Sequence, residues 1–288
     1  MSNLAQLHAY EESALLPQFF RGIRIETGPV PSTLDGETHN GVLWHAAPGQ
    51  FLLRVPEVAV FHVQGGHTIT IEREPKTDDI TVQRFTRMSP LAALFYQRGT
   101  LAFHAAAAAN SNGAILLAGD SGTGKSTLLT ALLSRGWTML ADELAVVNLD
   151  ESGTPRIPPA FPQVRLRQSA AEKLRLSPTG WGHDESNWRV VSAIHQFSLT
   201  SQPLHAIYWL TVHNVERIEQ HELEGMERYR AVGMLTYNSH IADALLDRAE
   251  YLRQASAIAQ TVPIRRLYRP RGKWVVEELA DQIETACA

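Results

Sequence analysis

Short apolar runs between polar turns predict that the first part of the chain is β-structure, and the alternation of apolar and polar residues over 67–72 predicts a strand with one face in water. Over residues 1–88, short runs of β-branched and aromatic residues are separated by turns that contain Pro or Gly, which is typical of strands. The predicted strands are 42–46, 51–55, 58–63 and 68–72, and a short helix over 3–15 precedes them. These elements predict a small β-rich domain over residues 1–88, for which substrate docking is a hypothesis.

After residue 88 the pattern changes to strands and helices in alternation. Ser89 and Pro90 predict the start of a helix over 89–97, with Ser89 as its cap. The predicted strands are 101–109, 113–118, 137–141 and 206–212, the predicted helices are 125–134 and 241–259, and residues 151–162 predict a loop. The order strand, Gly-rich turn, helix, strand predicts an α/β core in a second domain over 89–288.

The Gly-rich turn matches G-x-x-x-x-G-K-[ST], the pattern of phosphate-binding loops. Its residues are Gly119, Asp120, Ser121, Gly122, Thr123, Gly124, Lys125, Ser126 and Thr127. Glycines let the backbone curl so that its N–H groups form an anion nest, to which the following helix adds its positive dipole end. Lys125 supplies a charge for the β- and γ-phosphates, and the Ser126 hydroxyl is a ligand for Mg²⁺. The segment predicts nucleotide binding and leaves the base open.

Three side chains near this loop are candidates for the chemistry. Asp142 ends the next apolar run and Glu143 follows it, where a P-loop protein holds Mg²⁺ or its water with a carboxylate. The structural alternative is an acidic pair that faces solvent or caps a helix. His104 lies in a predicted strand beside the loop, and its structural alternative is a buried histidine bonded to the backbone.

A longer pattern around these residues resembles a known family. The unit F-H-A…G-A-I-L-L-A-G-D-S-G-T-G-K-S…S-R-G-W…L-A-D-E, within residues 100–145, is similar to the core of the HPr kinase/phosphorylase family and its smaller kinase relatives. The matching positions are His104, 119–126, Arg135-Gly136 and 141–143. The chain differs from that family in having Thr127 in place of Glu and Glu143 in place of the second Asp. It also lacks the downstream R-G-x-G loop, where Arg165 and Arg167 are the nearest counterpart.

The resemblance implies a fold and an activity. The fold is an α/β P-loop kinase core of the HPr kinase and phosphoenolpyruvate-carboxykinase-like type. The activity is ATP- and Mg²⁺-dependent phosphorylation of a serine in a peptide or protein, with Lys125 on the phosphates, Asp142 accepting the serine proton and His104 orienting it. Ser126, Asp142 and Glu143 are the metal ligands in this interpretation. The departures make the chain more similar to the kinases of peptide-modification systems, such as lasso peptide kinases, that act on a precursor peptide.

Two other functions are compatible with the same phosphate-binding loop. One is a nucleotide-sensing regulatory module that transfers nothing, and the other is a kinase for a small molecule such as free serine or a sugar. Arg165 and Arg167 are candidates for the γ-phosphate or for a plain exposed strand. The basic residues near the C-terminus are candidates for a phosphate or acidic-peptide contact or for a solvated strand, and they are Arg265, Arg266, Arg269, Arg271 and Lys273.

The composition and net charge of the chain disfavour some classes of binding partner. The chain of 288 residues has 44% apolar residues and a formal net charge of −4, which disfavours nucleic acid and anionic membrane surfaces as partners. Its one cysteine, Cys287, cannot form an internal disulfide. No run approaches the roughly 20 apolar residues of a membrane span. These features favour a cytoplasmic protein, and a homo-oligomer stays open.

Overall fold

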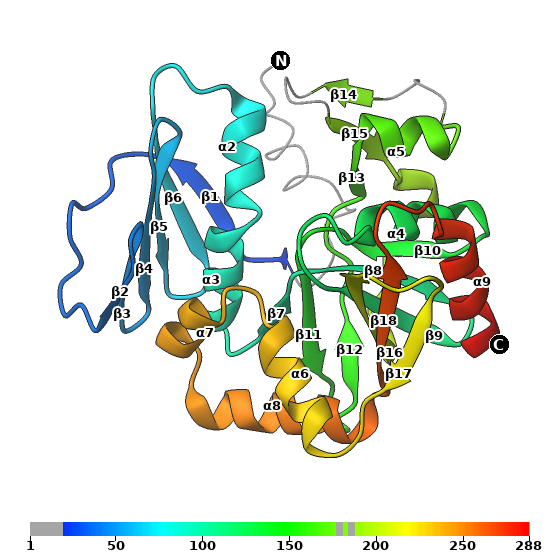
Figure 1. Cartoon of the computed structure of the whole chain (residues 1–288). Coiled ribbons are helices and arrows are strands. Elements are labelled where there is room, and N and C mark those ends of the chain that lie inside the picture. The colour runs from blue at the N-terminus through cyan, green and yellow to red at the C-terminus, as the bar shows by residue number, and fades with distance from the viewer. Residues whose placement is uncertain (1–19, 177–180, 184–187, 288) are drawn as a thin grey trace. The chain divides into compact units, whose positions relative to one another are not determined.

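The computed structural model describes residues 20–176, 181–183 and 188–287, with residues 181–183 described by their backbone alone. The predicted helix over 3–15 lies outside this part of the chain. The fold is mixed α/β, and it divides into two compact units (Figure 1). The first unit is residues 1–102 and 236–253, and the second is residues 103–235 and 254–288. The observed division therefore differs from the expected one, because the first unit continues past residue 88 and takes in a later segment.

The first unit is a six-stranded sheet with helices on it. The strand order is β1-β6-β5-β4-β3-β2, in which β1 is parallel to β6 and the other pairs are antiparallel. The strands are β1 (Arg24–Thr27), β2 (His39–Asn40), β3 (Trp44–Ala47), β4 (Gln50–Val55), β5 (Ala59–Gln64) and β6 (Thr68–Arg73). The four predicted strands correspond to β3–β6, and their apolar runs, such as Phe51, Leu52 and Leu53 of β4, are buried.

Helices α2 (Asp79–Thr86) and α3 (Ser89–Gln97) belong to the first unit, and α3 packs on the sheet through its buried residues. The cap residue of α3 is Met88 and not the expected Ser89, whose hydroxyl instead accepts a hydrogen bond from Asn238 Nδ2 at 2.9 Å. The helix predicted over 241–259 is two helices, α7 (Ser239–Leu245) and α8 (Arg248–Thr261). The break has a local cause, because Asp247 Oδ1 accepts hydrogen bonds from the amides of Ala249 and Glu250 and so starts α8.

The second unit contains a larger sheet in which parallel and antiparallel pairs are mixed. Its strands follow the order β10-β8-β9-β16-β12-β11, and β18 lies parallel to β16 with β17 beside it. The strands are β8 (Ala105–Asn110), β9 (Gly113–Ala118), β10 (Thr138–Ala141), β11 (Ala145–Leu149), β12 (Pro155–Ile157), β16 (Gln202–His213), β17 (Glu219–Glu222) and β18 (Ile264–Pro270). Residues 155–157 form strand β12, so the prediction of a loop over 151–162 was wrong at these positions. The strand expected over 101–109 is interrupted at His104, which separates β7 (Leu101–Phe103) from β8.

Helices α4 (Lys125–Ser134) and α9 (Val276–Ala286) pack on the larger sheet and share its core. Leu128, Leu129 and Leu132 of α4 are fully buried against sheet residues such as Leu117 and Tyr208. The rest of the unit is a small sheet of β13 (Gln163–Arg167), β15 (Trp188–Ser192) and β14 (Trp181–His183), together with α5 (Gln168–Lys173), α6 (Met226–Leu235) and the short helix η2 (Ile194–Gln196). No helix among the described residues is long and apolar enough to cross a membrane.

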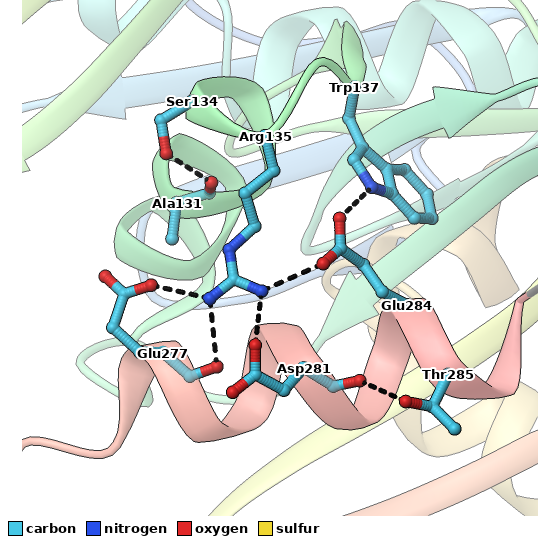
Figure 2. A network of polar contacts seen from close by, with 8 residues as sticks. All are labelled: Ala131, Ser134, Arg135, Trp137, Glu277, Asp281, Glu284 and Thr285. Carbon is cyan, nitrogen blue, oxygen red and sulfur yellow. Dashed lines mark hydrogen bonds and ion pairs between the residues drawn. The ribbon is translucent and has the colours of Figure 1, made fainter.

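An ionic cluster joins the end of α4 to α9. The guanidinium of Arg135 donates to Glu277 at 2.7 Å, to Asp281 at 2.6 Å and to Glu284 at 2.9 Å (Figure 2). Glu284 also accepts from the indole of Trp137 at 3.2 Å. The position that the sequence pattern matched as Arg-Gly is therefore an anchor for the C-terminal helix, at the opposite end of α4 from the phosphate loop.

Candidate functional site

The Gly-rich segment is a tight loop between β9 and α4. Gly119, Gly122 and Gly124 have positive φ angles of 134°, 84° and 100°, a region that side chains rarely adopt. A Cβ on Gly119 would lie 2.4 Å from the carbonyl oxygen of Leu210, so β16 leaves no room for a larger residue there. The loop therefore needs glycine for its backbone angles and, at Gly119, for its close contact with the sheet.

Several amides of this loop are available to a ligand. Within the part of the chain that the structure describes, the N–H groups of Gly122, Gly124, Lys125 and Ser126 meet no acceptor. Lys125 and Ser126 are in the first turn of the ten-residue helix α4, where amides have no partner inside the helix and the dipole favours an anion. The arrangement can bind phosphate through the backbone.

Lys125 is buried, with 6% of its surface exposed, and its Nζ donates to the carbonyl oxygens of Gly119 at 2.8 Å and Asp120 at 3.0 Å. Burial lowers the pKa of Lys125, and the nearby carboxylate of Asp142 acts against that shift. Backbone oxygens of the loop thus hold the ammonium in place. From there a small rotation of the side chain would bring it to a phosphate oxygen bound by the loop.

Asp142 and Ser126 meet beside the loop. Asp142 directly follows β10, and its Oδ1 accepts a hydrogen bond from Ser126 Oγ at 2.8 Å. Its Oδ2 accepts from the amide of Arg165 at 3.0 Å. Burial, and then the negative charge of Glu143, raise the pKa of Asp142 to about 7. The carboxyl group can therefore both hold and release a proton near neutral pH, which is the property of a general base.

Glu143 is in a conformation that is rare for residues other than glycine. Its φ is 69°, and the amide of Leu144 donates back to the carbonyl oxygen of Asp142 at 2.9 Å. Its Oε1 lies 3.7 Å from Nη1 of Arg165. Backbone strain of this kind is concentrated at functional sites. Here it occurs in the tight turn that carries the carboxylates of Asp142 and Glu143 next to the phosphate loop.

The site fits a Mg²⁺ ion that is shared with a phosphate. Ser126 offers a hydroxyl oxygen and Asp142 and Glu143 offer carboxylates, and Mg²⁺ prefers oxygen ligands from one or two carboxylates together with substrate phosphates. Among the described residues there is no group of three or more His, Cys, Asp or Glu side chains that could hold a metal ion. The residues present therefore suit a metal that arrives with a nucleotide and do not suit a protein-only cage.

His104 lies between β7 and β8 and lines the same cavity as Lys125. Burial, and then the positive charge of Lys125, lower its pKa to about 4. The imidazole is therefore neutral at pH 7, and it can position a hydroxyl or a water molecule but does not add a charge for the phosphates.

The cavity over the loop has a volume of about 170 Å³. The predicted residues that line it are His104, Ser121, Gly122, Gly124, Lys125, Ser126, Thr127 and Glu143. Asp142 is not among the lining residues and is joined to the cavity wall by its hydrogen bond to Ser126. Asp120 and Thr123 are not among them either, and the Thr123 hydroxyl braces the loop by donating to the carbonyl oxygen of Asp120 at 2.8 Å.

The sequence analysis did not predict some residues of the cavity wall, and for others it left the role open. Arg165 and Arg167, for which a phosphate contact was one of two interpretations, both line it, together with Lys173, Trp188 and Trp274. Trp188 and Trp274 carry no local signal of function. They reach the cavity from segments that are distant in the sequence.

The basic cluster near the C-terminus divides in the structure. Arg265 pairs with Glu222 at 3.1 Å, and Arg266 stacks over Trp209 at 4.3 Å. Arg269 instead donates from Nε to the carbonyl oxygen of Thr123 at 2.8 Å, and it lies about 3.8 Å from the Cβ that Gly124 would carry. Arg269 supports the phosphate loop from outside the cavity.

Comparison with known proteins adds little to this geometry. No family model matches the chain, and no curated protein matches it. Among solved structures, the HPr(Ser) kinase/phosphatase from Coxiella burnetii aligns over 64% of this chain and 95% of its own, with 9% sequence identity and a TM-score of 0.34. A likeness this low supports no conclusion on fold or chemistry.

Proposed function

We propose that this chain is an ATP-dependent kinase that transfers the γ-phosphoryl group to a serine hydroxyl in a peptide or protein, such as a ribosomally made precursor peptide. The observation that carries the proposal is the hydrogen bond between Ser126 and Asp142, at the end of a glycine loop with a buried Lys125. A loop serine that meets a strand-end carboxylate is the arrangement by which P-loop enzymes hold a metal–triphosphate. The resemblance of residues 100–145 to the HPr kinase family supports a hydroxyl acceptor.

The transfer would begin with the triphosphate on the amides of the loop and on Lys125. The serine oxygen forms a bond to the γ-phosphorus as the bond from that phosphorus to the bridging oxygen breaks, and ADP leaves with the electron pair. Asp142 would take the serine proton by way of the Ser126 hydroxyl, which lines the cavity and is bonded to its Oδ1, and this role suits a carboxyl group with a pKa of about 7. Neutral His104 orients the acceptor hydroxyl.

Ser126, Asp142 and Glu143 are the residues that would hold Mg²⁺ in this proposal. When bound, the ion neutralises negative charge on the phosphates. The other charges that this chain brings to the phosphates are the ammonium of Lys125 and the guanidinium of Arg165, which both lie at the cavity.

Incubation with γ-labelled ATP and serine-containing peptides, followed by mass spectrometry, tests the proposal. We expect a mass increase of one phosphoryl group on serine, and we expect Asp142→Asn to abolish it while calorimetry still detects ATP binding. Asp150→Asn is the matched control, because Asp150 is in a surface turn with Ser152 and Thr154. Full transfer by Asp142→Asn would exclude Asp142 as the base. ATP binding with slow hydrolysis and no phosphorylated acceptor would favour the nucleotide-sensing module instead.

A further inference from the structure

The cations that line the cavity differ in exposure. Lys125 is buried, whereas Arg167 at the end of β13 and Lys173 at the end of α5 are exposed. Trp188 and Trp274 lie beside these two cations, and 40% of the Trp274 surface is exposed. Strand β13 packs against α5 and against α4, the helix that begins at the phosphate loop (Figure 1).

The two exposed cations have aromatic partners. Arg167 lies with its Cζ 5.2 Å from the centre of the Trp188 ring, and Lys173 with its Nζ 4.8 Å from the centre of the Trp274 ring. Within the described part of the chain, neither cation is in ion-pair distance of a carboxylate, whereas Arg165 lies 3.7 Å from Glu143. An aromatic face orients a cation without neutralising it, so both charges remain available to an anion.

These charges stand out against the chain as a whole. The protein has 30 acidic and 26 basic residues, for a net charge of −4. A local concentration of uncompensated cations in an acidic protein attracts an anionic ligand to that place and not to the surface in general.

The size of the cavity indicates an extended ligand. Its volume of about 170 Å³ is below the roughly 300–1,000 Å³ of pockets that enclose a whole ligand. The phosphate loop forms one part of the cavity wall, and the two cations belong to an exposed part of it. A small acid held inside the cavity would leave that surface uncovered, whereas a peptide that enters with one serine would extend across it.

We infer that Arg167 and Lys173, oriented by Trp188 and Trp274, form a subsite for carboxylate side chains that flank the acceptor serine, so that the preferred substrate is an acidic peptide. This inference rests on the proposed function. The serine would lie at the phosphate loop, and Asp or Glu residues on either side of it would pair with the two cations.

Three synthetic peptides of equal length test the subsite, each with one central serine flanked by Glu, by Gln or by Lys. Binding to the full chain is measured by fluorescence anisotropy of a common label in the presence of a non-hydrolysable ATP analogue, and phosphorylation is measured with ATP. We expect the Glu peptide to bind about tenfold more tightly than the Gln peptide, as about two exposed ion pairs allow. We expect the Lys peptide to bind most weakly, and 0.5 M salt to reduce the preference.

The double variant Arg167→Gln/Lys173→Gln should lose most of the preference for Glu and keep the ATP affinity of the wild type within about twofold. Lys76→Gln, at an exposed lysine outside the cavity, is the control and should keep both. Equal binding of the Glu and Gln peptides, or binding of neither at 1 mM, overturns the inference. A tenfold loss of ATP affinity in the double variant with the peptide preference intact assigns the cations to the nucleotide and also overturns it. If the wild type binds no ATP in calorimetry, the proposed function itself is refuted. That outcome is distinct from the loss of peptide preference, which refutes only the subsite.

Discussion

Asp142→Asn should stabilise the protein at alkaline pH while it removes the proposed activity. The substitution keeps the size of the side chain and removes its charge. In the structure, Oδ1 of Asp142 faces the hydroxyl of Ser126 and Oδ2 faces the amide of Arg165. An asparagine with its oxygen toward Arg165 accepts the same backbone hydrogen bond, and its NH₂ group donates to Ser126 Oγ because a hydroxyl is also an acceptor. Both contacts therefore survive the loss of charge.

The magnitude follows from the pKa. In the folded protein the pKa of Asp142 rises from 3.8 to about 7, mainly through burial, and each unit corresponds to about 1.4 kcal/mol. Because the folded state holds this proton more tightly than the unfolded state, the wild type loses stability as the pH rises from about 4 through 7. The full shift sets an upper limit of about 4 kcal/mol. The side chain is only partly shielded from solvent, so we expect the advantage of the variant to grow by about 1–2 kcal/mol between pH 5 and pH 8.

Urea unfolding at both pH values, in EDTA and without nucleotide, measures the difference. Asp150→Asn is an informative control because hydrogen bonds from Ser152 and Thr154 lower the pKa of Asp150 below its ordinary value of 3.8. Asp150 is therefore ionised in the folded and unfolded states at both pH values, and the difference between Asp150→Asn and the wild type should not change between them. A difference between Asp142→Asn and the wild type that does not change with pH would refute the reasoning, because it would mean that Asp142 is not perturbed in the folded state.

Three other changes have expected outcomes of their own. Arg135→Ala should lower the free energy of unfolding by about 1–2 kcal/mol, because it leaves three carboxylates of α9 without their shared cation (Figure 2); an equal loss in 1 M salt, measured by urea unfolding, would argue against an ionic origin. The lowered pKa of His104 (about 4, from 6.5) means that the wild type loses stability relative to His104→Gln as the pH falls from 6.5 to 4; parallel unfolding curves over that range would contradict the burial argument. Lys125→Met should weaken ATP binding by at least tenfold in calorimetry, because the variant has no ammonium for the phosphates, and unchanged affinity would show that the nucleotide lies elsewhere.

The sequence by itself determined the phosphate loop and its neighbours. Helix α4 has the predicted bounds, and the glycines of the loop have the positive φ angles that their positions require. Strand β9 also has its predicted bounds, and the four strands predicted for the first unit, β3–β6, lie within a residue or two of theirs, whereas β1 and β2 were not predicted. These features are local, because a glycine in a left-handed conformation, a helical repeat or a strand alternation depends on residues a few positions apart.

The tertiary structure alone decided which side chains meet at the loop. Arg269 contacts Thr123 across 146 positions of the chain, and Lys173 reaches Trp274 from a different element. Such contacts follow from the order of strands in the sheet, here β9, β16 and β18 in parallel. That order depends on the packing of whole elements, which local hydrophobic patterns do not specify.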